Sequence, residues 1–396
     1  MNLPKFKIVY FFLAMYAYSF YTFKNLVIEL LTKINKPNQS TLNGIIFFIS
    51  FFINVFITFL TDKFKIHKQT LLTSLILSFI TFQFMLINQN KKLFYFLYFT
   101  YSCMNQVLSP IVDMFIYSSK LDYSKIRVFD SYGYIVSTCI SEVGYNILQV
   151  NQDKGLLFLK IFNLVTFFGL ITVFCLFLNE KQINTQQIKK SSSNFQPIRF
   201  VFLLFIVLLI GINRTSMSNF LSDYYKNFLQ LNKDNSKIKL SICSSFGVLG
   251  EIIVFNFSLT NLIGLFYPLF FGTFFQALRF LFYFMLKPTN SFLFVKVCGI
   301  ETMKGLTFSM VHSSCTALSK LYGGKYESMA QFIYNGTYVA LGNLCSGIFM
   351  SNTLNHGNDF SHFFKTNAIV CGISLFLIVL MKLIFVRGWH FTKKEV

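Results

Sequence analysis

The chain is organised as long apolar runs separated by short polar segments. A helix needs about 20 mostly apolar residues to cross about 30 Å of hydrocarbon, and twelve runs of this length lie between charged or turn residues. The sequence therefore predicts an all-α membrane protein with about twelve transmembrane helices. The predicted spans are 8–27, 42–60, 71–87, 93–118, 128–148, 156–178, 200–225, 238–258, 262–286, 292–318, 330–350 and 363–385.

The longest polar stretch is NEKQINTQQIKKSSSNFQP at residues 179–197, which has no amphipathic period. We interpret it as a linker between an N-terminal six-helix bundle, residues 1–178, and a C-terminal six-helix bundle, residues 198–396. Two pseudo-symmetric bundles are typical of secondary transporters, which bind their solute between the halves near the midplane. Lys and Arg outside the spans are more numerous on the side that carries both termini and the linker, which predicts that this side is cytoplasmic.

Composition agrees with a membrane protein: 54% of the residues are hydrophobic and only 13% are charged. The net charge of +20 comes from basic residues in short loops, so it is interpreted as a topology signal and predicts no nucleic-acid partner. Fifty-four Phe and twenty Tyr are interpreted as the bias of a coding sequence rich in A and T. We expect a monomer in the lipid bilayer, with the plasma membrane as the default location.

Eight cysteines lie inside or beside apolar segments, without C-x-x-C or the Cys/His spacing of a metal site. They are expected to be buried free thiols, and neither a metal nor a cofactor is expected. In the predicted orientation Asn38, within Asn-Gln-Ser, lies in the first external loop and is a candidate glycosylation site.

Ionised side chains inside the spans are the main functional candidates. Each costs about 2.5–3.5 kcal/mol at mid-membrane, so such residues persist mainly where they face a cavity or a partner. In spans four to ten these residues are Asp113, Glu142, Arg214, Glu251, Arg279, Lys296, Glu301, Lys304 and His312.

Span ten carries the most of these residues. At about 100° per residue, Glu301, Phe308 and His312 lie within about 30° of one line, and Lys304 lies about 70° away. One hypothesis is a proton or substrate-binding relay. The alternative is a structural ion pair of Glu301 with Lys304, or with Arg279 on the adjacent span.

Glu251 and His312 have structural alternatives as well. Glu251 follows Gly247 and Gly250, which allow close helix approach. Both a salt bridge with Arg279 and a direct substrate or proton role remain open for Glu251. His312 alone is expected to be a satisfied, helix-facing histidine.

Small residues form stripes on two other spans. Gly133 and Gly144 lie on one side of span five, and Gly336, Ala340 and Gly347 lie within about 40° on span eleven. These stripes predict helix-packing faces. Spans five and eleven hold equivalent places in their halves, which fits two matched bundles.

Several motifs support a family resemblance. After span two, the loop beginning Thr61-Asp62-Lys63 and ending at Lys68 looks like a transporter-type cytoplasmic loop of glycine, Asp and basic residues, although Thr58 and Lys65 replace both glycines. Asp62, Lys63, Lys68 and Arg127 are therefore the gating-loop candidates. The remaining motifs are Pro110-x-x-Asp113, Arg127-x-x-Asp-Ser-x-Gly133, Gly250-Glu251, Ala277-Leu-Arg279, Glu301-x-x-x-Gly305-x-x-Phe308 and Ala330-Gln331 with Gly336 and Gly342.

In these motifs the chain resembles the lactose-permease-like branch of the major facilitator superfamily, and within it the associated group similar to proton-coupled nucleoside transporters. The resemblance implies that Glu251, Arg279 and Glu301 line a cavity and couple protons to solute. The leading hypothesis is thus a secondary active transporter that moves a small polar solute, a nucleoside or sugar, with protons by alternating access.

The sequence bears on two other classes of function. The missing loop glycines favour, as the alternative, a non-transporting membrane receptor or scaffold that retains the fold. An enzyme is not expected, because the sequence has no H-E-x-x-H, no G-x-S-x-G and no Walker-type glycine loop.

Overall fold

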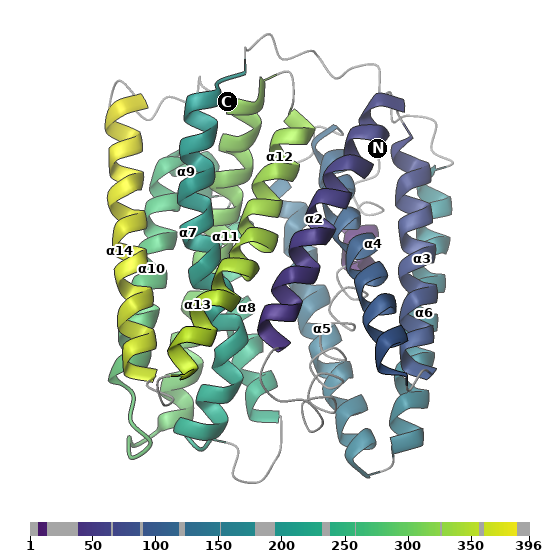
Figure 1. Cartoon of the computed structure of the whole chain (residues 1–396), viewed down its shortest axis with the longest axis horizontal. Coiled ribbons are helices and arrows are strands. Elements are labelled where there is room, and N and C mark those ends of the chain that lie inside the picture. The colour runs from purple at the N-terminus through teal and green to yellow at the C-terminus, as the bar shows by residue number, and fades with distance from the viewer. Residues whose placement is uncertain are drawn as a thin grey trace. The chain divides into compact units, whose positions relative to one another are not determined.

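The computed structural model consists of long helices and their connections. It describes residues 7–13, 39–64, 66–87, 90–118, 123–150, 152–178, 195–231, 238–257, 259–324, 327–355 and 360–385. Over these ranges the chain is helical with short turns and has no β-strand, which confirms the all-α prediction for the described residues (Figure 1). Most of predicted span one, the glycosylation candidate Asn38 and most of the polar stretch 179–197 lie outside the described residues.

The chain divides into two compact units. One comprises Met1–Gln39 and Ile49–Lys189, and the other Ser40–Phe48 and Lys190–Val396. Helix α2 (Gln39–Phe64) contributes residues to both. The finer boundaries at 178 and 198, and the six-helix composition of each half, stay predictions.

The first unit contains α3 (His67–Ile87), α4 (Lys91–Ser118), α5 (Tyr123–Val150) and α6 (Gln152–Leu178). Helix α3 packs on α4 and α6, and α5 packs on α6 and α4. Polar side chains join α2 to its neighbours: Asn54 donates to Gln106 of α4 at 3.2 Å, and the hydroxyls of Thr61 and Thr70 lie 3.0 Å apart. These side-chain contacts link α2 to α4 and to α3.

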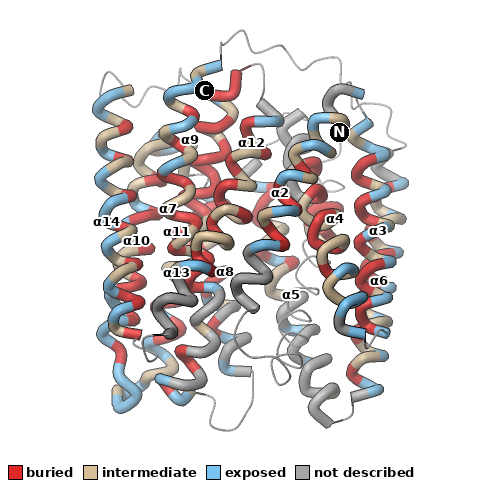
Figure 2. The backbone as a smooth tube through the Cα atoms, in the orientation of Figure 1, coloured by how far each residue is buried: buried red, intermediate tan, exposed pale blue. Residues whose placement is uncertain are grey.

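The second unit carries the longest helix, α11, at the centre of its packing. α11 contacts α7, α8, α10 and α12, and buried positions recur along its length (Figure 2). In chain order, the described elements of this unit are α7 (Pro197–Asp223), the π-helix η2 (Tyr224–Phe228), α8 (Ile238–Phe257), α9 (Leu259–Ile263), α10 (Phe266–Met285), α11 (Leu293–Gly323), α12 (Glu327–Gly336), the π-helix η4 (Thr337–Leu341), α13 (Gly342–Asn355) and α14 (Phe360–Phe385).

The described helices make the chain a multi-pass membrane protein. Among the described residues, five helices are long and apolar enough to cross a bilayer by length and composition: His67–Ile87, Asp153–Cys175, Pro197–Ser218, Phe266–Met285 and Phe360–Phe385. The other predicted spans after the first fall on α2, α4, α5, α8, α11 and the continuous helix α12–η4–α13. Of these, α2 and α8 contain shorter apolar stretches, Ile45–Thr61 and Ser245–Phe257. Exposed aromatic side chains along the helices, such as Phe56 and Phe376, suit contact with lipid.

The structure corrects three details of the sequence analysis. Span nine does not begin at Leu262: the short helix α9 ends at Ile263, and α10 begins at Phe266, because Gly264 adopts a positive φ of 81° that ends a helix.

The second correction concerns the cysteines. The thiols are not all buried, since Cys139 and Cys175 are exposed and Cys345 is half-buried.

The third correction concerns the stripe of small residues on span eleven. Residues 337–341 form the π-helix η4, so the constant 100° per residue that placed Gly336, Ala340 and Gly347 on one face does not hold across it. Gly347 is buried but Gly336 is only half-buried. The close approach to α7 is instead made by Gly342, which packs against Gly211.

Candidate functional site

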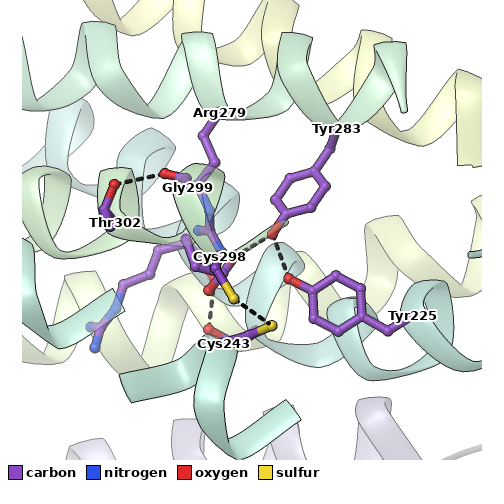
Figure 3. Close-up of polar contacts among 10 residues, drawn as sticks. Tyr225, Cys243, Arg279, Tyr283, Cys298, Gly299 and Thr302 are labelled. Atoms are coloured by element: carbon purple, nitrogen blue, oxygen red, sulfur yellow. Dashed lines mark hydrogen bonds and ion pairs between the residues drawn. The ribbon is translucent and has the colours of Figure 1, made fainter. Parts of the chain in front are cut away.

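A buried ion pair joins α10 and α11 inside the second unit. The guanidinium of Arg279 lies 2.6 Å from Oε1 of Glu301, and the two side chains are only 4% and 1% exposed. Figure 3 shows Arg279 extending from α10 toward α11. Of the pairings open for Glu301 from the sequence, the structure therefore has the one with Arg279 on the adjacent span.

Two tyrosines extend this pair into a network. The hydroxyl of Tyr283, one turn after Arg279 on α10, donates to the same Oε1 of Glu301 at 2.5 Å. The hydroxyl of Tyr225, at the π-helical end of α7, lies 2.5 Å from that of Tyr283 (Figure 3). Because an ionised carboxylate is stabilised by charged and hydroxyl donors, this arrangement suits a negative charge on Glu301 in a site closed to water.

Helix α8 packs closely against α11 beside Glu301. A Cβ added at Gly250 would lie 2.5 Å from the carbonyl oxygen of Thr302, and one added at Gly305 would overlap the backbone of Gly247. At Gly247 the neighbours of such a Cβ would be Oε2 of Glu301 and the stem of Lys304, at 3.8 and 3.3 Å. Lys304 also interacts electrostatically with Glu301. Glycines thus bring α8 against the charged face of α11.

This contact gives a direct test on stability. We expect Gly305→Ala to lower the free energy of unfolding by about 1–3 kcal/mol, since α8 must move away from the new methyl group. Gly299→Ala on the same helix is the matched control: a Cβ there meets nothing within 4 Å, and removing a helical glycine gains about 0.5–1 kcal/mol. Thermal unfolding in detergent measures both, and equal stability of the two variants would contradict this packing.

A second polar cluster lies around Arg214 of α7. Its guanidinium carbon is 4.7 Å from the ring centre of Phe308 on α11 and 4.8 Å from that of Tyr338 in η4, so the cation is held between two aromatic faces. Glu251 and Arg214 both interact electrostatically with Tyr338, which links Glu251 of α8 to this cluster. Arg214, Phe308 and Glu251 are each partly exposed.

His312 completes the aromatic side of the cluster. Its Nδ1 lies 3.0 Å from the hydroxyl of Tyr334 on α12, and its ring stacks on Phe308 with centres 5.2 Å apart. Tyr334 in turn stacks on Tyr338 at 6.2 Å. His312 therefore has the partner expected of a satisfied, helix-facing histidine. The imidazole of His312 lies between Phe308 and Tyr334. Its stacking on Phe308 helps to fix the ring of Phe308, which faces Arg214.

The remaining predicted residues lie outside these two clusters or outside the described side chains. Arg127 is not in a loop: it lies inside α5, where it is buried, pairs with Asp130 at 2.9 Å and covers the ring of Tyr10. Lys68 and Lys296 are exposed near the starts of α3 and α11, and Gly133 is buried in α5. The side chains of Asp62, Lys63, Asp113 and Glu142, and the surroundings of Gly144, are not among those described.

Sequence reasoning missed the tyrosines of both clusters. Tyr283 had a local signal, because it lies four residues after Arg279 and so on the same face of α10. Tyr225 had none, since its hydrogen bond joins residues 58 positions apart. Tyr334 and Tyr338 lie on the helix α12–η4, where the π-helical turn changes the angle between successive residues, so a constant helical period did not reveal their common face.

Comparison with known proteins adds a family and a fold. The model of the MFS_1 like family matches residues 3–365. Two of the solved structures that match are similar over nearly the whole chain. One is a point mutant of the nucleoside transporter NupG, with a TM-score of 0.71, 15% identity and coverage of 96% of this chain and 99% of that one. The other is NupG itself, with a TM-score of 0.67, 16% identity and coverage of 98% and 100%. No curated protein matches the sequence.

Proposed function

The chain belongs to the MFS_1 like family, and we propose that it is a secondary active transporter that moves a small polar solute by alternating access between two halves. The observation that carries this proposal is the buried Arg279–Glu301 pair with its tyrosine donors, inside a multi-pass membrane protein with the fold of a nucleoside transporter. Such a charge in a membrane span is costly, and it persists where a binding or coupling function requires it.

Coupling to protons follows from the chemistry of Glu301. A carboxyl group that is only 1% exposed must be neutralised either by a cation or by a proton. Arg279 neutralises it in this conformation. If the transport cycle separates the pair, Glu301 takes up a proton, and re-forming the pair releases it. This exchange would tie solute movement to proton movement.

The Arg214 cluster is the proposed solute contact. Phe308 and Tyr338 offer flat aromatic faces, Arg214 offers hydrogen-bond donors, and Glu251 offers an acceptor. This combination suits a small polar solute with a planar or ring-shaped part, such as a nucleoside or a sugar. The nucleoside transporters that share the fold support a nucleoside as the first solute to test.

A non-transporting receptor or scaffold is the second candidate. It is favoured by the missing glycines of the motif around the end of span two: Thr58, inside α2, occupies one glycine position, and its hydroxyl donates to the backbone carbonyl of Asn54. In either case we propose a monomer at the plasma membrane with cytoplasmic termini.

Solute-dependent stabilisation distinguishes the two candidates. A carrier at a solute concentration of about 100 Kd gains about 2.7 kcal/mol of stability by linkage. We expect at least one nucleoside or sugar in a broad panel to raise the unfolding temperature of the purified protein. Phe308→Ala should remove the shift, and Phe376→Ala, at an exposed position of α14, should keep it. No response to any solute would favour the scaffold.

A further inference from the structure

Two cysteines from different helices face each other beside the ion pair. Sγ of Cys243 on α8 lies 3.6 Å from Sγ of Cys298 on α11, and both residues are buried free thiols. Figure 3 shows the two sulfur atoms pointing toward each other. Nothing in the proposed transport cycle uses them. We propose that Cys243 and Cys298 form a redox-sensitive disulfide site that covalently ties α8 to α11.

The packing of the two helices suits such a bond. A disulfide needs Cα atoms within about 7 Å and Cβ atoms about 4 Å apart. Helices that approach through glycines reach short separations, and α8 and α11 do so at Gly247, Gly250 and Gly305. Both cysteines lie in the second turn of their helices, on the same end of this contact. The two Sγ atoms, 3.6 Å apart, must approach by about 1.5 Å to reach the S–S bond length of about 2.05 Å.

The chemistry balances with a peroxide as the oxidant. Hydrogen peroxide converts one thiol to a sulfenic acid and releases one water; the second thiol then attacks that sulfur, forms the S–S bond and releases a second water. The two thiols lose two electrons and two protons in all. The partner thiol at 3.6 Å intercepts the sulfenic acid before it is oxidised further.

The location of the pair favours oxidation. With cytoplasmic termini, as proposed above, α8 and α11 are the eighth and tenth spans, and both begin on the non-cytoplasmic side. Cys243 and Cys298 then lie near the outer ends of their helices, in the direction of the oxidising compartment. Lys239 and Lys296, in the first turns of the same helices, are exposed, so these ends lie at the surface of the unit.

The bond would stabilise the region around the ion pair. Cys298 lies one turn before Glu301, so a link to α8 at this point fixes the helix that carries the carboxylate. The disulfide would join residues 55 positions apart and so would reduce the conformational entropy of the unfolded chain. We expect it to raise the unfolding temperature of the second unit by roughly 5 °C or more.

Peptide mapping tests the proposal independently of transport. The purified full-length protein is treated with hydrogen peroxide, its remaining thiols are alkylated, and its peptides are analysed by mass spectrometry without and with reduction. We expect one linked peptide pair joining Cys243 to Cys298, which dithiothreitol separates. Cys175→Ser, which removes an exposed thiol elsewhere, should leave the link unchanged.

Variants of the pair complete the test. Cys243→Ser or Cys298→Ser should abolish both the link and the rise in unfolding temperature, and two independent variants guard against misfolding of one. Wild-type protein in which Cys243 and Cys298 remain separately alkylated after oxidation would overturn the proposal. An equal peroxide-induced temperature shift in wild type and in a folded Cys243→Ser variant would overturn the stabilising role.

Discussion

Replacing Arg279 by Gln lowers the free energy of unfolding of the second unit by about 3–5 kcal/mol, because it leaves the carboxylate of Glu301 buried without its cation. Tyr283 still donates one hydrogen bond to that carboxylate, but a neutral hydroxyl does not balance a full charge. Thermal unfolding of purified protein measures the loss, which is the largest stability change that we expect from a single substitution of a charged residue here.

A paired substitution separates charge from packing. In Arg279→Gln/Glu301→Gln both buried charges are absent, and two amides of similar size can hydrogen bond to each other and to Tyr283. The double variant should therefore recover most of the lost stability. Arg199→Gln is the matched control, because Arg199 of α7 covers the ring of Phe385, at 5.6 Å, away from the ion pair. A double variant as unstable as Arg279→Gln would contradict an ion pair between these two residues.

Neutralising either acidic candidate should abolish proton-driven transport. We expect Glu301→Gln and Glu251→Gln to reduce solute accumulation to that of vesicles without protein, since a permanent amide cannot exchange a proton with solution. Glu301→Gln also leaves Arg279 unpaired, so uptake is measured for Arg279→Gln/Glu301→Gln as well and expressed per folded transporter. Asp153→Asn, at an exposed acid of α6, is the control. Undiminished, pH-dependent uptake in both acidic variants would contradict proton coupling through these residues.

The lengths of the apolar runs were sufficient to predict most of the helices that the structure describes. Span length is set by bilayer thickness, so a local count of residues predicts each span. Its ends were less predictable, because Gly264 breaks span nine by a backbone angle rather than by polarity. The π-helices η2 and η4 were not predicted either, since a one-residue change of helical phase leaves no mark in a hydropathy pattern.

The charged residues of the site were predictable because ionised side chains are costly, and therefore rare, inside apolar spans. Glu301 and Arg279 violate apolar runs at a cost of several kcal/mol each, and the sequence analysis singled out both. Their pairing was one of several open arrangements, because spacing along one helix does not reveal which residue of a neighbouring helix lies opposite. The distance of 2.6 Å between Arg279 and Glu301 results from the packing of α10 against α11.

Phe308 was placed beside Glu301 and His312 by the helical period, but the tyrosines were missed because aromatic residues are abundant throughout the chain. Among 54 Phe and 20 Tyr, no tyrosine stood out from a compositional bias. The structure nonetheless gathers Phe308, Tyr334 and Tyr338 around Arg214 and His312. What distinguishes these rings is contact with a cation and a histidine, and only the packing of α7, α11 and α12 with η4 creates that contact.

Accumulation of solute in liposomes is the most direct test of the central claim that the chain is a proton-coupled carrier. Purified protein is reconstituted, nucleosides and sugars are supplied outside, and a proton gradient, acidic outside, is imposed. The account predicts that at least one solute accumulates above its external concentration, and that a protonophore abolishes this accumulation. Absence of solute entry across the whole panel, with correctly folded and inserted protein, would contradict it.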